Sequence, residues 1–181
     1  MSWKSIAGVL ALAGSIMLAG CGGGGGSGNI PTSTSVVVAF SLVSTARLPA
    51  RISGVNIAAH LPAGVSVATD SANPRQISAT ALVAGSAMDS LPAADKIIIG
   101  SYSSDGNLVS ISTAGAAGTP GFGPGEYARL TCLVAPGVNV TENGIRALNT
   151  PLASFKVTGF DPATHSTVDL TNLLQPHFTV H

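Results

Sequence analysis

Short runs of β-branched and apolar residues, separated by glycine and proline, constrain the fold of this chain more than any other feature. "SVVVAFSLV", "GVSVAT", "YARLTCLV" and "ASFKVTGF" are typical of strands, and "KIIIGSY" is typical of a buried one. In "ISGVNIAAHLP" apolar and polar residues alternate, which predicts a strand with one buried face. The buried face of that strand would hold Val55, Ile57, Ala59 and Leu61, and the other face would hold Asn56, Ala58 and His60.

The remaining segments extend the same pattern. "QISATALVAG", "LVSIS", "GIRAL", "STVDLTN" and "HFTVH" are also predicted to be strands, and "SAMDSLPAAD" could hold one helical turn. "SSDGN" predicts a hairpin turn, because Asp-Gly supplies the positive φ angles that tight hairpins need. Many short strands with Gly/Pro turns predict an all-β fold, an antiparallel β-sandwich of the jelly-roll type with about nine strands, over residues 35–181.

The first residues have the organisation of an export signal. Lys4 precedes an apolar stretch over residues 6–18, which is too short to span a membrane. The following "LAGC" resembles the lipobox of bacterial lipoproteins, with Leu18, Ala19, Gly20 and Cys21 at its four positions. The resemblance implies cleavage between Gly20 and Cys21, so that residues 1–20 are a signal peptide and Cys21 carries acyl chains such as palmitate. The alternative is an ordinary secretory signal cut at a nearby small residue.

A flexible tether follows the cysteine. "GGGGGSGN" and "IPTSTS" predict a linker over residues 21–34 with a reach of roughly 20 Å. Several acyl chains would anchor the chain firmly, since each buried methylene contributes about 0.8 kcal/mol. By resemblance to sorting in enterobacteria, glycine after Cys21, in place of aspartate, favours the outer membrane over the inner one. We therefore expect an extracytoplasmic protein of the cell envelope, anchored by lipid.

Three segments of the body resemble cohesin domains and the related carbohydrate-binding modules. "ISGVNIAAHLPAGVSV" is similar to the early strands of cohesins, "PGFGPGEYARLTCLVAPG" to a later Gly-rich loop and long strand, and "SFKVTGFDPATHSTVDL" to the final hairpin. The resemblance covers about residues 35–180. It implies a nine-stranded jelly-roll sandwich with a binding or scaffolding role and no catalysis.

The net charge argues against nucleic acid as a partner. Eight basic and eight acidic residues cancel, so the chain has no basic field for nucleic acid.

The pattern around Cys132 predicts where its side chain lies. Cys132 would share a strand face with Ala128, Leu130 and Val134, while Arg129 points to the other face. This placement predicts a small buried hydrophobe and argues against a reactive thiol.

Catalytic and metal-binding patterns are weak. His177 and His181, four apart on a strand, would lie about 13 Å from each other, too far for one zinc ion. His60 is expected to face solvent. No Gly-x-Ser-x-Gly nucleophile pattern occurs, and no cluster of carboxylates is seen in the sequence, so we expect no enzyme and no catalytic residues. A hydrolase whose site forms only in three dimensions is the remaining enzymatic alternative.

No cofactor and no metal site is predicted. Asp105, Asn107 and Asp161 are loop oxygen donors that leave a structural calcium ion open, but calcium needs six to eight oxygens and no EF-hand-type loop is present. Asp105-Gly106 and Asp161-Pro162 are each explained as turns.

The aromatic inventory disfavours carbohydrate as the ligand, because sugar sites use exposed aromatic faces. Trp3 would be removed with the signal, and Phe40 and Phe155 lie in apolar strand patterns. Phe122, in "GTPGFGPG", is the one aromatic residue expected in an exposed loop.

Two non-catalytic functions of different classes are therefore favoured over an enzymatic function. The first is a lipid-anchored binding or scaffolding module that recognises another protein through a sheet face or through the Gly-rich loop 114–125. The second is a structural envelope subunit that assembles by strand addition at a sheet edge.

Overall fold

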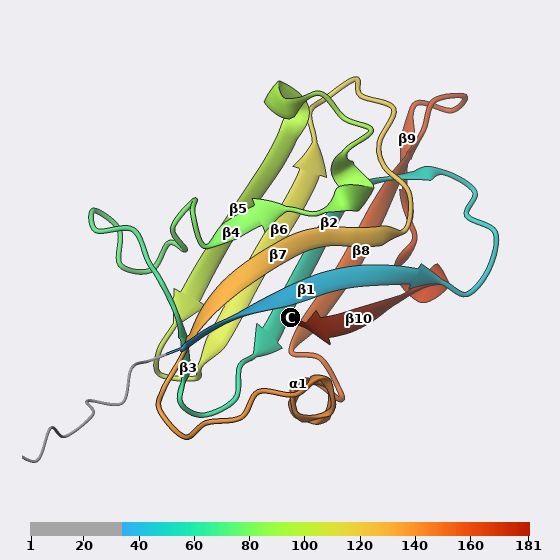
Figure 1. Ribbon diagram of the computed structural model, residues 1–181. Coiled ribbons are helices and arrows are strands. Elements are labelled where there is room, and N and C mark those ends of the chain that lie inside the picture. The colour runs from blue at the N-terminus through green and yellow to red at the C-terminus, as the bar shows by residue number, and fades with distance from the viewer. Residues whose placement is uncertain (1–33) are drawn as a thin grey trace, which may run out of the picture. The chain divides into compact units, whose positions relative to one another are not determined.

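The computed structural model describes residues 34–181 (Figure 1). The predicted signal peptide, the cleavage site between Gly20 and Cys21, the lipid attachment at Cys21 and all of the linker but its last residue lie outside the described residues. The predicted all-β class is confirmed, and the ten strands observed agree with the expected number of about nine. Every strand pairing is antiparallel.

The strands form two five-stranded sheets that face each other as a sandwich (Figure 1). Sheet A has β7 at its centre, flanked by β1 and β10 on one side and by β3 and β4 on the other. Its members are β1 (Thr34–Ser44), β3 (Val65–Val67), β4 (Leu82–Ala84), β7 (Gly125–Val134) and β10 (Leu174–Val180). Sheet B has the order β5-β6-β2-β8-β9. Its members are β2 (Arg51–His60), β5 (Lys96–Ser103), β6 (Leu108–Gly115), β8 (Ser154–Asp161) and β9 (Ser166–Asp169).

The core fills the space between the sheets, and the alternation seen in the sequence selects it. Val55, Ile57, Ala59 and Leu61 are all buried, as the pattern of β2 predicts. The same holds for one face of β7, where Ala128, Leu130, Cys132 and Val134 are buried while Arg129 is exposed. β1 adds Val38, Phe40 and Leu42, and Phe40 meets Phe178 edge-on with ring centroids 5.4 Å apart.

One predicted strand is a helix. "GIRAL" belongs to α1 (Glu142–Leu148), which lies beside β10 at one end of the sandwich (Figure 1). Thr141 starts the helix, because its side chain accepts a hydrogen bond from the Gly144 amide at 3.1 Å. Asn149 then fixes the helix end to β2: its amide donates to the carbonyls of Ile145 and His60, at 2.8 and 2.9 Å. These bonds and the burial of Ile145 outweigh the weak strand signal of five residues.

The prediction of a strand over "QISATALVAG" was also mostly wrong. Only Leu82–Ala84 is a strand there, and the preceding residues form turns with isolated bridges from Gln76 to Ser101 and from Ile77 to Thr69. Ile77 and Ala81 are buried, whereas Val83 is 44% exposed. The predicted helical turn in "SAMDSLPAAD" is confirmed as two 3₁₀ turns, Ser86–Met88 and Ala93–Asp95.

β5 is an edge strand and was wrongly predicted to be buried. Ile97 and Ile99 are 43% and 58% exposed, because their side chains point to the outer face of sheet B, while Ile98, Gly100 and Tyr102 point inward. The predicted hairpin between β5 and β6 is present, but Asn107 (φ 47°), and not Gly106, has the positive φ angle.

Candidate functional site

The outer face of sheet B is a broad surface that the described residues leave uncovered. The strand register places Ile99, Ser112, Asn56 and Lys156 in one row across β5, β6, β2 and β8. The rows beside it along the same strands hold Ile97, Ala114, Gly54 and Thr158 on one side, and Ser101, Ser110, Ala58 and Ser154 on the other.

Small side chains dominate the centre of this face. Ser112 donates a hydrogen bond of 2.6 Å to the Asn56 side chain, which holds both side chains against the sheet. The larger apolar side chains lie toward its two lateral edges, with Ile97 and Ile99 on β5 and Phe160, which is 38% exposed, on β8. A surface that is nearly uncharged at its centre and apolar at its margins has the character of a protein-binding face.

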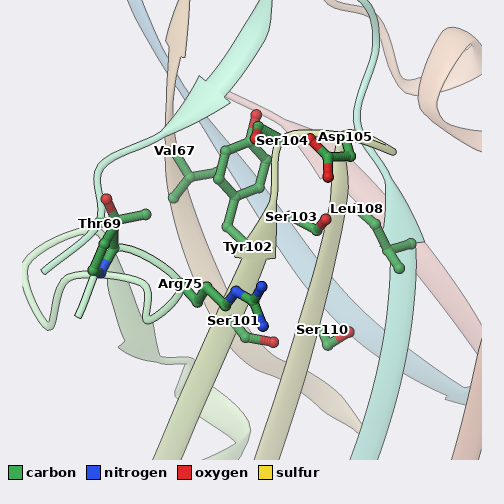
Figure 2. A pocket seen from close by; sticks show the side chains of 11 residues that line it. Val67, Thr69, Arg75, Ser101, Tyr102, Ser103, Ser104, Asp105, Leu108 and Ser110 are labelled. Carbon is green, nitrogen blue, oxygen red and sulfur yellow. The ribbon is translucent and has the colours of Figure 1, made fainter.

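A cleft of about 690 Å³ lies at one end of this face, between the β5–β6 hairpin and the loop that follows β3 (Figure 2). Its polar lining consists of Thr69, Arg75, Ser101, Ser103, Ser104, Asp105 and Ser110. Figure 2 shows the Arg75 side chain extending from the loop toward Ser101. The two ion pairs found within residues 34–181, Lys96–Asp89 and Arg129–Glu126, do not involve Arg75 or Asp105. Both charged groups of the cleft are therefore available to a ligand.

Tyr102 is the aromatic residue of the cleft, and its position is fixed. Its hydroxyl donates a hydrogen bond to Asn107 Oδ1 at 2.8 Å. The Asn107 amide in turn donates to the carbonyls of Leu61 and Pro62, at 2.9 and 2.7 Å. Partial burial, and to a smaller extent the proximity of Cys132, raises the pKa of the Tyr102 phenol. The hydroxyl therefore stays protonated, and the ring is fixed on the core-facing side of β5, opposite to the side chains of Ser101 and Ser103.

The expectation for Phe122 was wrong. It is fully buried, because its backbone pairs with Ile52 through two hydrogen bonds of 3.0 and 2.9 Å. Because of this pairing, the middle of the Gly-rich loop points toward the protein interior. Gly121 makes the approach feasible, since a Cβ atom at its φ of 72° would strike the Ile52 backbone. Tyr127 is also fully buried, which leaves Tyr102 as the tyrosine beside a cleft.

The Gly-rich loop 114–125 nevertheless borders three smaller hollows. Their volumes are about 570, 190 and 330 Å³, and together they surround Phe160 and Pro162 on the β8 side. Arg51, which donates from Nε to the Gly121 carbonyl at 3.2 Å, ties the loop to the start of β2. Arg47 lines the largest of these hollows.

Two of the three loop residues that could bind calcium, Asp161 and Asn107, are already engaged in hydrogen bonds within the chain. Asp161 accepts from the Ala163 amide and the Thr164 hydroxyl, each at 2.9 Å, and these bonds lower the pKa of its carboxyl. Asn107 is committed to Tyr102 and to two carbonyls, as described above. Asp105 lies apart from this network, at the cleft.

The histidines are dispersed. His60 is half-buried, with Nδ1 2.9 Å from the Gly106 carbonyl, so the expectation that it faces solvent holds only in part. His177 lies half-buried on β10, and His181 follows the end of that strand. His165 lies in the β8–β9 turn with its ring 6.3 Å from that of Phe160. Within residues 34–181, no group of three or more His, Cys, Asp or Glu side chains is arranged to hold a metal ion.

Cys132 is confirmed as a small buried residue. It is fully buried on β7, and this burial raises the pKa of its thiol to about 12. A thiolate is therefore scarce at neutral pH.

Among the helices in the described part of the chain, none has both the length and the apolar character needed to cross a membrane.

Comparison with known proteins found no matching family model, no matching curated protein and no matching solved structure.

Proposed function

We propose that this protein is a lipid-anchored, non-catalytic binding or scaffolding module of the bacterial cell envelope, which recognises another protein through the outer face of sheet B. The observation that carries the proposal is the uncovered face itself. It joins small side chains such as Ser112 and Ala58 at its centre to the exposed isoleucines of β5 at its margin. The cohesin resemblance of the sequence supports the same role.

The anchor is part of the proposal. Cys21, freed by cleavage after Gly20, would carry the acyl chains, and residues 22–33 would connect it to β1, which begins at Thr34. Glycine after Cys21 favours the outer membrane. A body tethered in this way meets partners at the membrane surface, where a short linker raises their effective concentration.

The anchor is tested by replacing its acceptor. Cys21→Ala is expected to remove palmitate labelling and to release the protein from the membrane fraction. Cys132→Ala is the matched control, because Cys132 is buried on β7 and should leave the labelling unchanged. Labelling that persists in Cys21→Ala would rule out the lipobox interpretation.

The binding face is tested by a bulky charge at its centre. Ser112→Arg should abolish capture of the partner in crosslinking pull-downs from intact cells. Ser66→Arg, on an exposed position of β3 in the other sheet, is the control and should capture the same partner as the unmodified chain. Equal capture by both variants would show that sheet B is not the binding face.

A second candidate function, a structural subunit that assembles by strand addition, is favoured by the edge of β5. Gly100 and Tyr102 direct their backbone bonds away from β6, where the Ile77 amide and the Arg75 carbonyl meet them at 2.9 and 2.8 Å. Ile98 has the same orientation, because backbone groups alternate along a strand, and no partner for it lies within residues 34–181. The unpaired part of the edge, at Ile98, lies beside the exposed Ile97 and Ile99 and is a template for another strand.

Light scattering separates the two candidates. Under the binding-module proposal the purified chain stays monomeric at high concentration. Under strand addition it forms oligomers or fibres, and Ile99→Lys should disperse them, since a charge on an edge strand opposes pairing. A monomer at all concentrations would eliminate the second candidate.

A further inference from the structure

The three hollows beside the Gly-rich loop 114–125 join into one groove, which we call the loop groove. The hollow of about 570 Å³ shares Arg51 and Pro162 with the hollow of about 330 Å³. The latter shares Thr119 and Phe160 with the hollow of about 190 Å³. Three connected depressions fit an extended segment better than a compact small molecule.

Most of the lining of the loop groove is apolar, and prolines stiffen it. Because the proline ring fixes φ, these wall segments lose little conformational freedom when a ligand binds. Phe160, which is 38% exposed, adds an aromatic surface that can pack against apolar side chains. The prolines of the lining are Pro49, Pro120, Pro124 and Pro162.

The charges in the lining have one sign. Its charged residues are Arg47 and Arg51, and no aspartate or glutamate of the described residues lines the groove. An arginine guanidinium binds a carboxylate through two parallel hydrogen bonds. The loop groove is therefore complementary to a ligand that combines carboxylates with apolar groups.

Both arginines are available to such a ligand. Neither belongs to the two ion pairs found within residues 34–181. Arg51 donates from Nε to the Gly121 carbonyl, which leaves the two terminal amino groups of its guanidinium for a ligand. Asp161, next to Pro162 in the chain, accepts hydrogen bonds from the turn that follows it.

The place of the groove in the fold favours a protein segment over lipid headgroups as the source of the carboxylates. β1 begins at Thr34, where the proposed linker joins, and ends at Ser44, which lines the groove (Figure 1). A strand of 11 residues is roughly 33 Å long. The groove and the attachment point of the linker therefore lie at opposite ends of β1.

We infer that the loop groove binds an extended acidic segment of a partner protein, with carboxylates on Arg47 and Arg51 and apolar side chains in the three hollows. This second binding site goes beyond the outer face of sheet B, and the inference does not depend on that face.

The test is fluorescence anisotropy of a labelled, end-blocked peptide that contains aspartate and leucine in equal numbers, titrated with the purified full chain. The same peptide with asparagine in place of aspartate is titrated in parallel. Saturable binding is expected for the acidic peptide, and binding at least tenfold weaker for the neutral one, because only carboxylates form charge-assisted bonds with the arginines.

Arg47→Gln should weaken binding of the acidic peptide at least tenfold. Arg146→Gln is the matched control, since it makes the same change at an exposed position of α1, and it should bind like the unmodified chain. Arg47 is itself exposed, so its replacement tests the charge without disturbing the core.

Gly123→Leu tests the hollows. Gly123 lines the largest hollow, and a Cβ atom there would meet no other atom within 4 Å, so a leucine can obstruct the groove without a clash. It should weaken binding of the acidic peptide at least tenfold. Gly106→Leu is the control, because a Cβ in that hairpin turn has similar space, and it should leave binding unchanged.

The inference is overturned if the acidic peptide shows no saturable binding, if both peptides bind equally, or if Arg47→Gln binds as well as Arg146→Gln. Sedimentation of the Cys21→Ala chain with phosphatidylglycerol vesicles tests lipid as the alternative. Co-sedimentation that Arg47→Gln abolishes, without binding of the acidic peptide, would assign the arginines to headgroups and overturn the inference. Each of these results would leave the pull-down test of the sheet B face unaffected, so the two proposals fail separately.

Discussion

Tyr127→Phe should stabilise this protein, although it removes a polar group from a core tyrosine. The Tyr127 side chain is fully buried, and its hydroxyl has no hydrogen-bond partner within residues 34–181. Burial raises the pKa of this phenol far above its usual value, so the group is neutral throughout the physiological range. A buried hydroxyl without a partner costs about 1–3 kcal/mol, because it has lost its bonds to water and gained none.

The substitution leaves the packing of the ring in place. Tyr127 meets Phe40 edge-on, with ring centroids 6.5 Å apart, and phenylalanine can keep that geometry. The space vacated is that of one oxygen atom. Removing the hydroxyl recovers its desolvation cost, but it also loses the dispersion contacts of one oxygen atom. We therefore expect the free energy of unfolding to rise by about 1 kcal/mol, the lower end of the range of desolvation costs.

Tyr102→Phe is the matched control, since it makes the same chemical change where the hydroxyl has a partner. It removes the 2.8 Å bond to Asn107 Oδ1 and leaves that oxygen partly buried without its donor. The expected effect has the opposite sign, a loss of about 0.5–1.5 kcal/mol.

Urea unfolding of the full chain at pH 7, followed by far-UV circular dichroism, measures both changes from the transition midpoint at constant m-value. In a thermal scan, each 1 kcal/mol should shift Tm by about 2–4 °C for a domain of this size. A Tyr127→Phe variant that is less stable than the unmodified chain would refute the reasoning, because it would mean that the hydroxyl makes a stabilising bond.

Three further predictions concern local features of the fold. Thr141→Ala should destabilise the protein by about 1 kcal/mol in urea titration, because it removes the side-chain bond to the Gly144 amide that caps α1; an unchanged midpoint would mean that this cap contributes nothing. Gly85→Ala should lower Tm markedly, since its Cβ would collide with the Glu126 backbone, and a Tm equal to that of the unmodified chain would contradict the close approach. Alkaline pH should destabilise the protein through Cys132. The unfolded thiol ionises near 9 while the folded pKa is about 12, so stability is complete below pH 9 and falls by up to about 1.4 kcal/mol per pH unit above it. Thermal scans from pH 8 to 11 measure this loss, and Cys132→Ala should reduce the slope; an equal slope in that variant would assign the loss to other groups.

Much of the sandwich could be predicted from residue patterns, because the alternation of apolar and polar residues along a strand identifies its buried face. Successive side chains of a strand point to opposite faces, so the pattern around Val55 and Ile57 identifies the buried face of β2 without knowledge of its neighbours. The same argument correctly placed Cys132 in the core and Arg129 outside it.

The segments that were predicted wrongly are those where the position of a strand, and not its pattern, decides the outcome. "KIIIGSY" has the composition of a strand buried on both faces, yet β5 is an edge strand with one face directed outward, so Ile97 and Ile99 face solvent. Phe122 lies among glycines and prolines, which are typical of an exposed loop. Its burial depends on a backbone pairing with Ile52, a residue distant in sequence, and the residues around Phe122 do not predict such a pairing.

The candidate cleft was beyond sequence reasoning for a similar reason. Tyr102 and Asp105 are close in the chain, but Arg75 comes from a separate loop, and its placement follows from the bridge between Gln76 and Ser101. The fixing of Tyr102 by Asn107 likewise requires the carbonyls of Leu61 and Pro62, which the connection between β2 and β3 supplies.

The sequence by itself determined that this is an antiparallel all-β chain and which faces of β2 and β7 are buried, since both follow from local periodicity. It also contains "LAGC", whose resemblance to a lipobox ending at Cys21 is the basis of the proposed anchor. Only the tertiary structure decided which strands form the edges, which aromatic side chain borders a cleft, and which charged residue joins it there. Those outcomes depend on pairings between distant segments, whose hydrogen bonds and contacts no local pattern of residues specifies.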